Sequence, residues 1–157
     1  MSEVVLREKL GDFNSIVCLK AVVVGLEEVM GEQGARANLI LAGRIRGKTI
    51  AKSLGLSNTD KPVEEWSAML RDAVGTNGTR LCRIEKVEMD KDAIRVYLLE
   101  TVCSAGEPQG SQRKLTFTLG AIQGAVEEVL GKKFLVVQSG SVLRGQDYDI
   151  VELVERC

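Results

Sequence analysis

The chain has 157 residues, and none of them is histidine. A histidine general base, a Ser-His or Cys-His nucleophile pair, and imidazole ligands for zinc or haem are therefore excluded within this chain. The sequence also lacks a G-x-x-x-x-G-K-[ST] phosphate loop and a G-x-G-x-x-G turn after a strand. We expect no catalytic residue, no metal site and no nucleotide binding through either of these glycine-rich motifs.

Cysteine is sparse and scattered. Cys18, Cys82, Cys103 and Cys157 form no C-x-x-C pair, which argues against a zinc ribbon or a dithiol motif. We expect reduced thiols in a cytoplasmic protein, with Cys18 and Cys82 as small core residues. The formal net charge of −1 provides no overall positive field, so we expect no nucleic-acid partner.

Long hydrophobic runs are also missing. The most apolar stretch, residues 16–26, is broken by Lys20 and is about half as long as the roughly 20 residues that a membrane span requires. Residues 1–10 mix charged with apolar side chains, so we expect no signal peptide. We predict a buried core element at residues 16–26 and no transmembrane segment, with attachment at a membrane surface as an alternative location.

The residues that are present predict an α+β fold in one domain, residues 1–157, with an antiparallel sheet covered by about four helices. Periodicity, candidate caps and glycine stops predict helices over residues 14–30, 35–54, 62–75 and 116–130. Alternating patterns predict strands over residues 81–89, 93–102, 133–138 and 148–155. Ile84 and Val87 fall on opposite faces of the first strand, which indicates a β-bulge.

The first predicted helix contains few charges, namely Lys20, Glu27 and Glu28. A helix that is apolar on nearly all sides must be covered on nearly all sides. We therefore expect it at the centre of the domain or at a subunit interface.

The second predicted helix carries Gly43 and Gly47 on one stripe. Glycine costs about 1 kcal/mol relative to alanine inside a helix, so another backbone is expected close to this face. The opposite side carries four aligned cations, Arg36, Arg44, Lys48 and Lys52. This row is either a solvated face or an anchor for carboxylates or phosphates.

Other segments have simpler interpretations. The adjacent pairs of glutamates, Glu27-Glu28, Glu64-Glu65 and Glu127-Glu128, point in different directions on a helix and are expected to be surface charges. Residues 104–114 are rich in glycine and polar side chains and are expected to form a mobile loop. Trp66 is expected in the core, with a place in the wall of a ligand cavity as the alternative.

Two groups of residues resemble a known family. They are Ala42-Gly43-Arg44 with Gly47, Ala51 and Leu54-Gly55, and Gly120-Ala121-Ile122-Gln123-Gly124 with Glu127, Leu130-Gly131, a valine-rich strand and Gly145. In this order they resemble the 4-vinyl-reductase-like domain family, which is related in fold to core subunits of the TRAPP vesicle-tethering complex. The resemblance covers most of the chain.

The resemblance implies a helix layer on an antiparallel sheet, commonly in a dimer, that binds tetrapyrrole intermediates, hydrocarbons or acyl groups. Family members occur in bacteriochlorophyll synthesis and in photosystem assembly, which links the expected function to photosynthesis. Members often carry cysteines in the turn after the penultimate strand and in the last strand. This chain has Ser141 and Asp149 there, so metal or thiol chemistry at these positions is not expected.

The leading expectation is a non-catalytic module for small-molecule binding or assembly, homodimeric through the glycine-bearing or the all-apolar helix. A tetrapyrrole is the candidate ligand, with Arg44 and Lys48 meeting its propionates and Trp66, Phe117 or Tyr148 lining its pocket. One alternative is a protein-interaction subunit without a ligand, as in TRAPP-like assemblies. Another is a tetrapyrrole reductase component that works with an external reductase.

Overall fold

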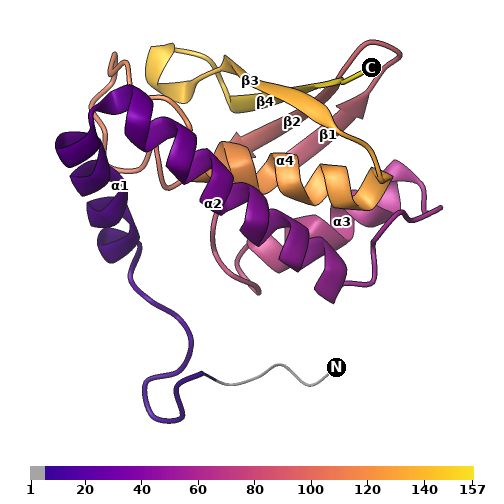
Figure 1. The fold of residues 1–157 in the computed structure, drawn as a ribbon, viewed down its shortest axis with the longest axis horizontal. Helices are drawn as coiled ribbons and strands as arrows, with labels where there is room; N and C mark the ends of the chain where they lie inside the picture. Colours follow the sequence, from indigo (N-terminus) through magenta and orange to yellow (C-terminus); the bar gives the residue numbers. More distant parts are fainter. Residues whose placement is uncertain (1–5) are drawn as a thin grey trace.

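The computed structural model describes residues 6–157, and this part of the chain forms four α-helices and four strands. Figure 1 shows their arrangement. In order they are α1 (Ile16–Met30), α2 (Glu32–Ser53), α3 (Val63–Val74), β1 (Arg83–Met89), β2 (Ile94–Leu99), α4 (Phe117–Leu130), β3 (Phe134–Gly140), the 3-10 helix η1 (Val142–Arg144) and β4 (Asp149–Glu155). The predicted α+β fold is confirmed. The domain expected from the sequence also includes residues 1–5, which lie outside the described residues.

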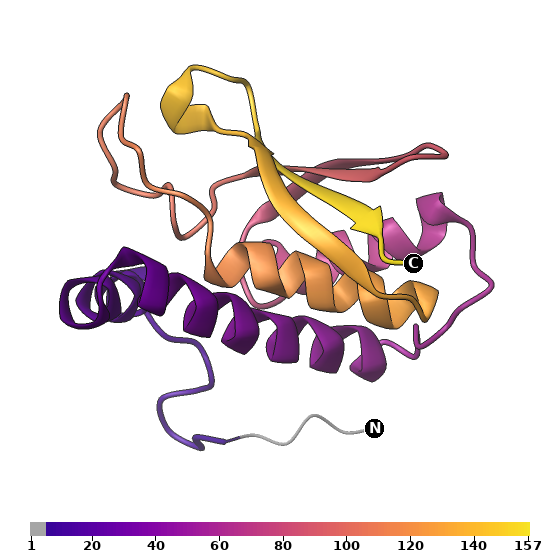
Figure 2. The same cartoon turned by 45° about the horizontal axis from the view of Figure 1, so that its top comes forward.

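The four strands form one antiparallel sheet in the order β1-β2-β4-β3. The register shifts between Ile84 and Lys86, which confirms the predicted bulge in β1. Side chains of β2 alternate between buried and half-buried, as expected for a strand with one covered face. Figure 2 shows that α4 lies against this sheet and that α2 lies on the far side of α4.

The contact between α2 and α4 is unusually close. A Cβ atom added to Gly43 would lie 2.0 Å from the carbonyl oxygen of Phe117, and one added to Gly47 would lie 1.9 Å from that of Ala121. Because the contacts advance in the same direction along both helices, α2 and α4 run parallel. The close backbone expected from the glycine stripe is therefore α4.

The packing is reciprocal. Cβ atoms added to Gly120 and Gly124 of α4 would lie 1.9 Å and 2.0 Å from the carbonyl oxygens of Ile40 and Arg44. The glycine face of α2 is thus occupied within the chain. A second subunit therefore cannot use the glycine face itself. The homodimer expected through this helix stays a prediction, because Leu41 and Ile45 of α2 are 53% and 62% exposed.

Helix α1 lies at one end of the molecule, where the N-terminal half of α2 is the one helix that it packs against (Figure 1). Leu19 of α1 also touches the edge of the main core. Val23 is its one buried residue, and it forms a small core with Ala35 and Leu39 of α2. The expectation of a buried core element here is wrong, because α1 has a single neighbouring helix to cover it. Cys18 is likewise exposed rather than in the core.

The main core lies between the sheet and helices α3 and α4. Trp66 of α3 is 2% exposed and belongs to this core, as expected. Cys82 is also buried there, as expected. No helix in the described part of the chain is both long and apolar enough to cross a membrane.

Candidate functional site

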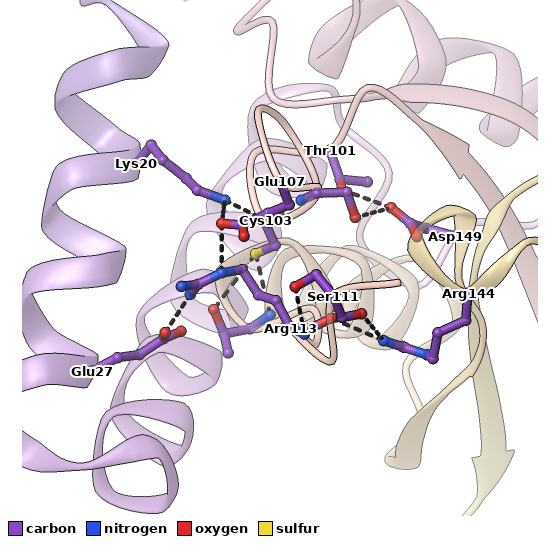
Figure 3. Close-up of polar contacts among 11 residues, drawn as sticks. Lys20, Glu27, Thr101, Cys103, Glu107, Ser111, Arg113, Arg144 and Asp149 are labelled. Atoms are coloured by element: carbon purple, nitrogen blue, oxygen red, sulfur yellow. Dashed lines mark hydrogen bonds and ion pairs between the residues drawn. The ribbon is translucent and has the colours of Figure 1, made fainter. Parts of the chain in front are cut away.

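The loop between β2 and α4, residues 100–116, is fixed at its start by a buried carboxylate. Asp149 is 0% exposed and accepts hydrogen bonds from the hydroxyl groups of Thr101 and Ser104, both at 2.8 Å. It also accepts one from the backbone N–H of Val142 at 3.1 Å. Figure 3 shows Asp149 hydrogen-bonded to Thr101 at the start of the loop. Together these bonds join the loop to the β3–β4 turn.

Ser141 lies in the turn after β3, and Asp149 is the first residue of β4. The Ser141 hydroxyl accepts a hydrogen bond from Leu143 N–H at 3.2 Å and so caps η1. Among residues 6–157 no group of three or more His, Cys, Asp or Glu side chains is arranged to hold a metal ion. Hydrogen bonds hold this turn in place.

The middle of the β2–α4 loop is tied to the β3–β4 turn. Gly110 N–H donates to the Leu143 carbonyl at 2.7 Å, and Arg144 donates to the carbonyls of Ser111 and Arg113, both at 3.2 Å. The expectation of a mobile loop at residues 104–114 is therefore not met. The partners lie about 30 residues downstream, so local composition gave no sign of them.

On its other side the same loop is tied to α1 by two ion pairs. Lys20 Nζ lies 2.8 Å from Glu107 and donates to the Cys103 carbonyl at 2.6 Å. Arg113 bridges Glu107, at 2.7 Å, and Glu27 of α1 (Figure 3). The hydrogen bond from Lys20 is the main cause that lowers the pKa of the Glu107 carboxyl, and burial opposes it. The polar face of α1 is thus held to the loop by charge.

A pocket of about 260 Å³ lies where α1, α2 and this loop meet. We call it the α1–α2 pocket. Its lining consists of Glu27, Glu32, Arg36, Ser111, Gln112, Arg113, Lys114 and Thr116. A second pocket of about 490 Å³ lies between α3 and β1 and is also lined mostly by polar and charged side chains. Sequence reasoning missed both pockets, because each joins segments distant in the chain.

Two of the residues predicted to bind a ligand lie side by side. Arg44 contacts the Glu127 carboxylate at 2.8 Å, and Lys48 Nζ lies 3.9 Å from it. Glu127 is 3% exposed, and its other oxygen accepts a hydrogen bond from Phe134 N–H at 3.1 Å. The expectation that Glu127 is a surface charge is wrong. The neighbouring cation Lys133, then burial, lower the pKa of Lys48.

The aromatic candidates are dispersed. Trp66 is in the core, and Phe117 is the first residue of α4, beside Gly43. Tyr148 packs edge-on against Tyr97 at 5.5 Å between ring centroids. Tyr97 alternates with the buried residues of β2, so this aromatic pair lies on the sheet face opposite the helices. The structure brings Arg44 and Lys48 together but places the sheet between them and Tyr148.

No family model matches the sequence, and no curated protein matches it significantly. Solved structures do share its fold. The phenol-responsive sensory domain of the transcription activator PoxR, solved with phenol, superposes with a TM-score of 0.69 at 14% identity, over 91% of this chain and 76% of that one. A vinyl-4-reductase family protein from Methanocaldococcus jannaschii superposes with a TM-score of 0.52 at 16% identity, over 95% and 86% of the two chains.

The matches include the expected kind of TRAPP protein. Trafficking protein particle complex subunit 3 from Naegleria fowleri, covalently bound to palmitic acid, superposes with a TM-score of 0.48 at 10% identity, over 91% of this chain and 98% of that one. The likeness in fold to a vinyl-4-reductase family protein, inferred from glycine spacing, is confirmed.

Proposed function

We propose that this chain is a non-catalytic assembly module that forms a homodimer through the outward face of α1. The observation that carries the proposal is the exposure of large apolar side chains along that helix. Val17, Val22 and Val29 are 71%, 54% and 86% exposed. Leaving such side chains in water is unfavourable, so a covering partner is expected.

The outward face has the spacing of a helix–helix seam. Cys18, Val22, Gly25 and Val29 recur at intervals of four, three and four residues. This spacing places them on one stripe of a helix, as in coiled coils. The only charged side chain next to the stripe is Glu28, which is exposed.

Gly25 gives a second reason to expect a helix partner. A Cβ atom added there would meet nothing within 4 Å, although glycine inside a helix costs about 1 kcal/mol. The α2–α4 glycines, such as Gly43 and Gly120, each allow a neighbouring helix backbone to approach. By the same logic Gly25 suits a close helix approach from a second molecule.

The exposed apolar area of α1 can be compared with what a dimer of ordinary size needs. Three valines on the exposed side of α1, Val17, Val22 and Val29, are 54–86% exposed and together offer on the order of 200 Å² of apolar surface. A standard interface of about 800 Å² per partner, slightly more than half of it apolar, needs about 450 Å². The valines of α1 supply about half of this area, and neighbouring small residues add to it.

Light scattering of point variants tests the proposal. Val22→Lys places a charge at the centre of the seam and is expected to lower the apparent mass from dimer to monomer at micromolar concentration. Leu135→Lys is the matched control, because Leu135 is 57% exposed but lies on β3. A dimer that survives Val22→Lys, or one that only Leu135→Lys dissociates, contradicts the proposal.

A complementary variant is Gly25→Ala. If α1 had no partner, the added methyl group would only improve helix propensity and raise stability by up to about 1 kcal/mol. In the proposed dimer it also weakens association, since it separates the two helix backbones. A rise in stability without any change in the dimer dissociation constant counts against the close approach at Gly25.

Small-molecule binding is a second candidate function, and the fold shared with a phenol-responsive sensory domain favours it. The ligand proposed from the sequence is a tetrapyrrole. Its propionates would meet Arg44 and Lys48, the two cations that lie side by side on α2. Incubation with haem or protochlorophyllide tests this candidate. A shifted pigment spectrum that Lys48→Gln abolishes supports it, whereas an unchanged spectrum rejects it.

A further inference from the structure

The residues that line the α1–α2 pocket are not needed for the proposed dimer. From its position, volume and charges we infer that it binds a small organic monocarboxylate. The pocket joins Glu27 of α1, Arg36 of α2 and Lys114 of the β2–α4 loop. None of these residues belongs to the outward seam of α1.

The charges in the pocket do not balance. Arg113 is neutralised by Glu27 and Glu107, and Glu107 also pairs with Lys20, so these four charges form a closed set. Arg36 and Lys114 remain, and neither makes an ion pair with any residue in the described part of the chain. Against them the lining offers one further carboxylate, Glu32. The excess is one positive charge, which a monoanion matches.

Two helix N-termini add to the positive potential. Glu32 is the first residue of α2, and Thr116 is the N-cap of α4. Neither helix has a side-chain cap, so backbone N–H groups of both first turns are left without the usual side-chain acceptor. Since α2 and α4 run parallel, the positive ends of both dipoles lie on the same side of the molecule. The negative end of α1, whose C-cap is Gly31 at the start of α2, offsets part of this potential.

The volume sets the size of the ligand. About 260 Å³ is several times the roughly 30 Å³ that one water occupies and lies just below the range for drug-sized ligands. An inorganic anion would leave most of this space to solvent. A carboxylate attached to a small ring or a short aliphatic chain fills it, with the carboxylate between Arg36 and Lys114.

Occupancy of the pocket would also hold α1 in place. Glu27 contributes to both the pocket lining and the ion pair that ties α1 to Arg113. A ligand seated there contacts α1, α2 and the loop together. The helix that carries the proposed dimer face is thus expected to become more rigid when the ligand binds.

Benzoate is the probe that tests the inference, with benzyl alcohol as an uncharged molecule of similar size. In amide NMR spectra of the full chain, benzoate is expected to shift the signals of Arg36, Lys114 and Thr116 with a dissociation constant in the millimolar range or below. Benzyl alcohol is expected to bind at least tenfold more weakly. Equal binding of both probes, or no shift at these residues, overturns the inference.

Charge-removing variants locate the site. Arg36→Gln and Lys114→Gln are each expected to weaken benzoate binding about tenfold, because each removes one charge-assisted contact. Lys91→Gln removes the same charge from the β1–β2 turn and is expected to leave binding unchanged. Equal weakening by all three variants would indicate nonspecific attraction and reject the site. Since these shifts are measured whether the chain is monomeric or dimeric, failure here leaves the dimer proposal standing.

Discussion

Gly47 of α2 lies against the backbone of Ala121 of α4, where an added Cβ atom would be 1.9 Å from the Ala121 carbonyl oxygen. Backbone, rather than a flexible side chain, fills the space, so the helices would have to move apart to admit a methyl group. This contact fixes the spacing between α2 and α4, and α4 in turn covers the sheet.

Gly47→Ala is expected to destabilise the protein by about 3 kcal/mol, since overpacking against backbone outweighs the gain in helix propensity. Gly34→Ala is the control in the same helix, because its added Cβ would make only an ordinary contact of 3.7 Å with Met30. That variant is expected to be neutral or slightly stabilising. Urea unfolding measures both, and similar midpoints for the two variants would contradict the close packing.

Glu127→Gln is expected to lower the free energy of unfolding by about 2 kcal/mol. The substitution removes the charge that Arg44 faces across 2.8 Å and leaves a half-buried guanidinium without a carboxylate. The Arg44 side chain is 30% exposed, so solvation of its guanidinium reduces the loss of stability. Glu128→Gln, at the next and more exposed position, is expected to cost less than 1 kcal/mol in the same unfolding experiment.

Burial, and then the negative charge of Asp149, raise the pKa of the Cys82 thiol to about 12. An unfolded thiol has a pKa near 8.5. The folded state therefore binds this proton more tightly, and its contribution to stability is complete below about pH 8.5 and is lost as the pH rises toward 12. Between about pH 8 and pH 10 the loss from this one group amounts to about 2 kcal/mol.

Cys82→Ala isolates that contribution. The variant is less stable at neutral pH because it leaves a cavity, but its stability is expected to fall less between about pH 8 and pH 10 than that of the wild type. Lysines and tyrosines titrate equally in both proteins, so their effect cancels in the comparison. Identical pH dependence in urea unfolding would show that Cys82 already ionises in the folded state.

The sequence allowed the helices and strands to be predicted because each has a clear period and clear stops, such as Gly31 after α1, where φ is 76°. The sequence also indicated a close backbone at Gly43 and Gly47, since glycine inside a helix is unfavourable unless another chain segment packs closely there. The identity of that backbone could not be read from the spacing. Which helix packs there depends on the tertiary fold, which brings α4 back against α2.

The candidate site was less predictable. Asp149 and Arg144 hold a loop that precedes them by about 30 to 50 residues, and no local pattern marks such partners. Glu127 and Glu128 are identical neighbours, yet one is buried and the other is not. Tertiary packing distinguishes them, because Glu127 faces Arg44 of α2 and accepts a hydrogen bond from Phe134 N–H.

The orientation of the proposed dimer leads to a cross-linking prediction. An antiparallel pairing of α1 keeps Glu28 away from the partner's Glu28 and sets Cys18 opposite the partner's Val29. In a Cys157→Ser background, which removes the other exposed thiol, Val29→Cys is expected to form an intermolecular disulfide under mild oxidation. Two Cys18 residues would lie about 16 Å apart along the antiparallel helices, too far for a disulfide.

Cys157→Ser alone is the control for that experiment, and it is expected to remain uncross-linked on a non-reducing gel. Efficient cross-linking through Cys18 in this control would indicate a parallel pairing. Absence of any cross-link with Val29→Cys would also contradict the antiparallel arrangement.

Native mass spectrometry of the wild-type chain tests the central claim most directly, because it reports subunit number and bound mass together. We predict a dominant species at twice the 17.1 kDa of one chain, and Val22→Lys should convert it to the single-chain mass. A wild-type spectrum with only the single-chain species at micromolar concentration would contradict assembly through α1.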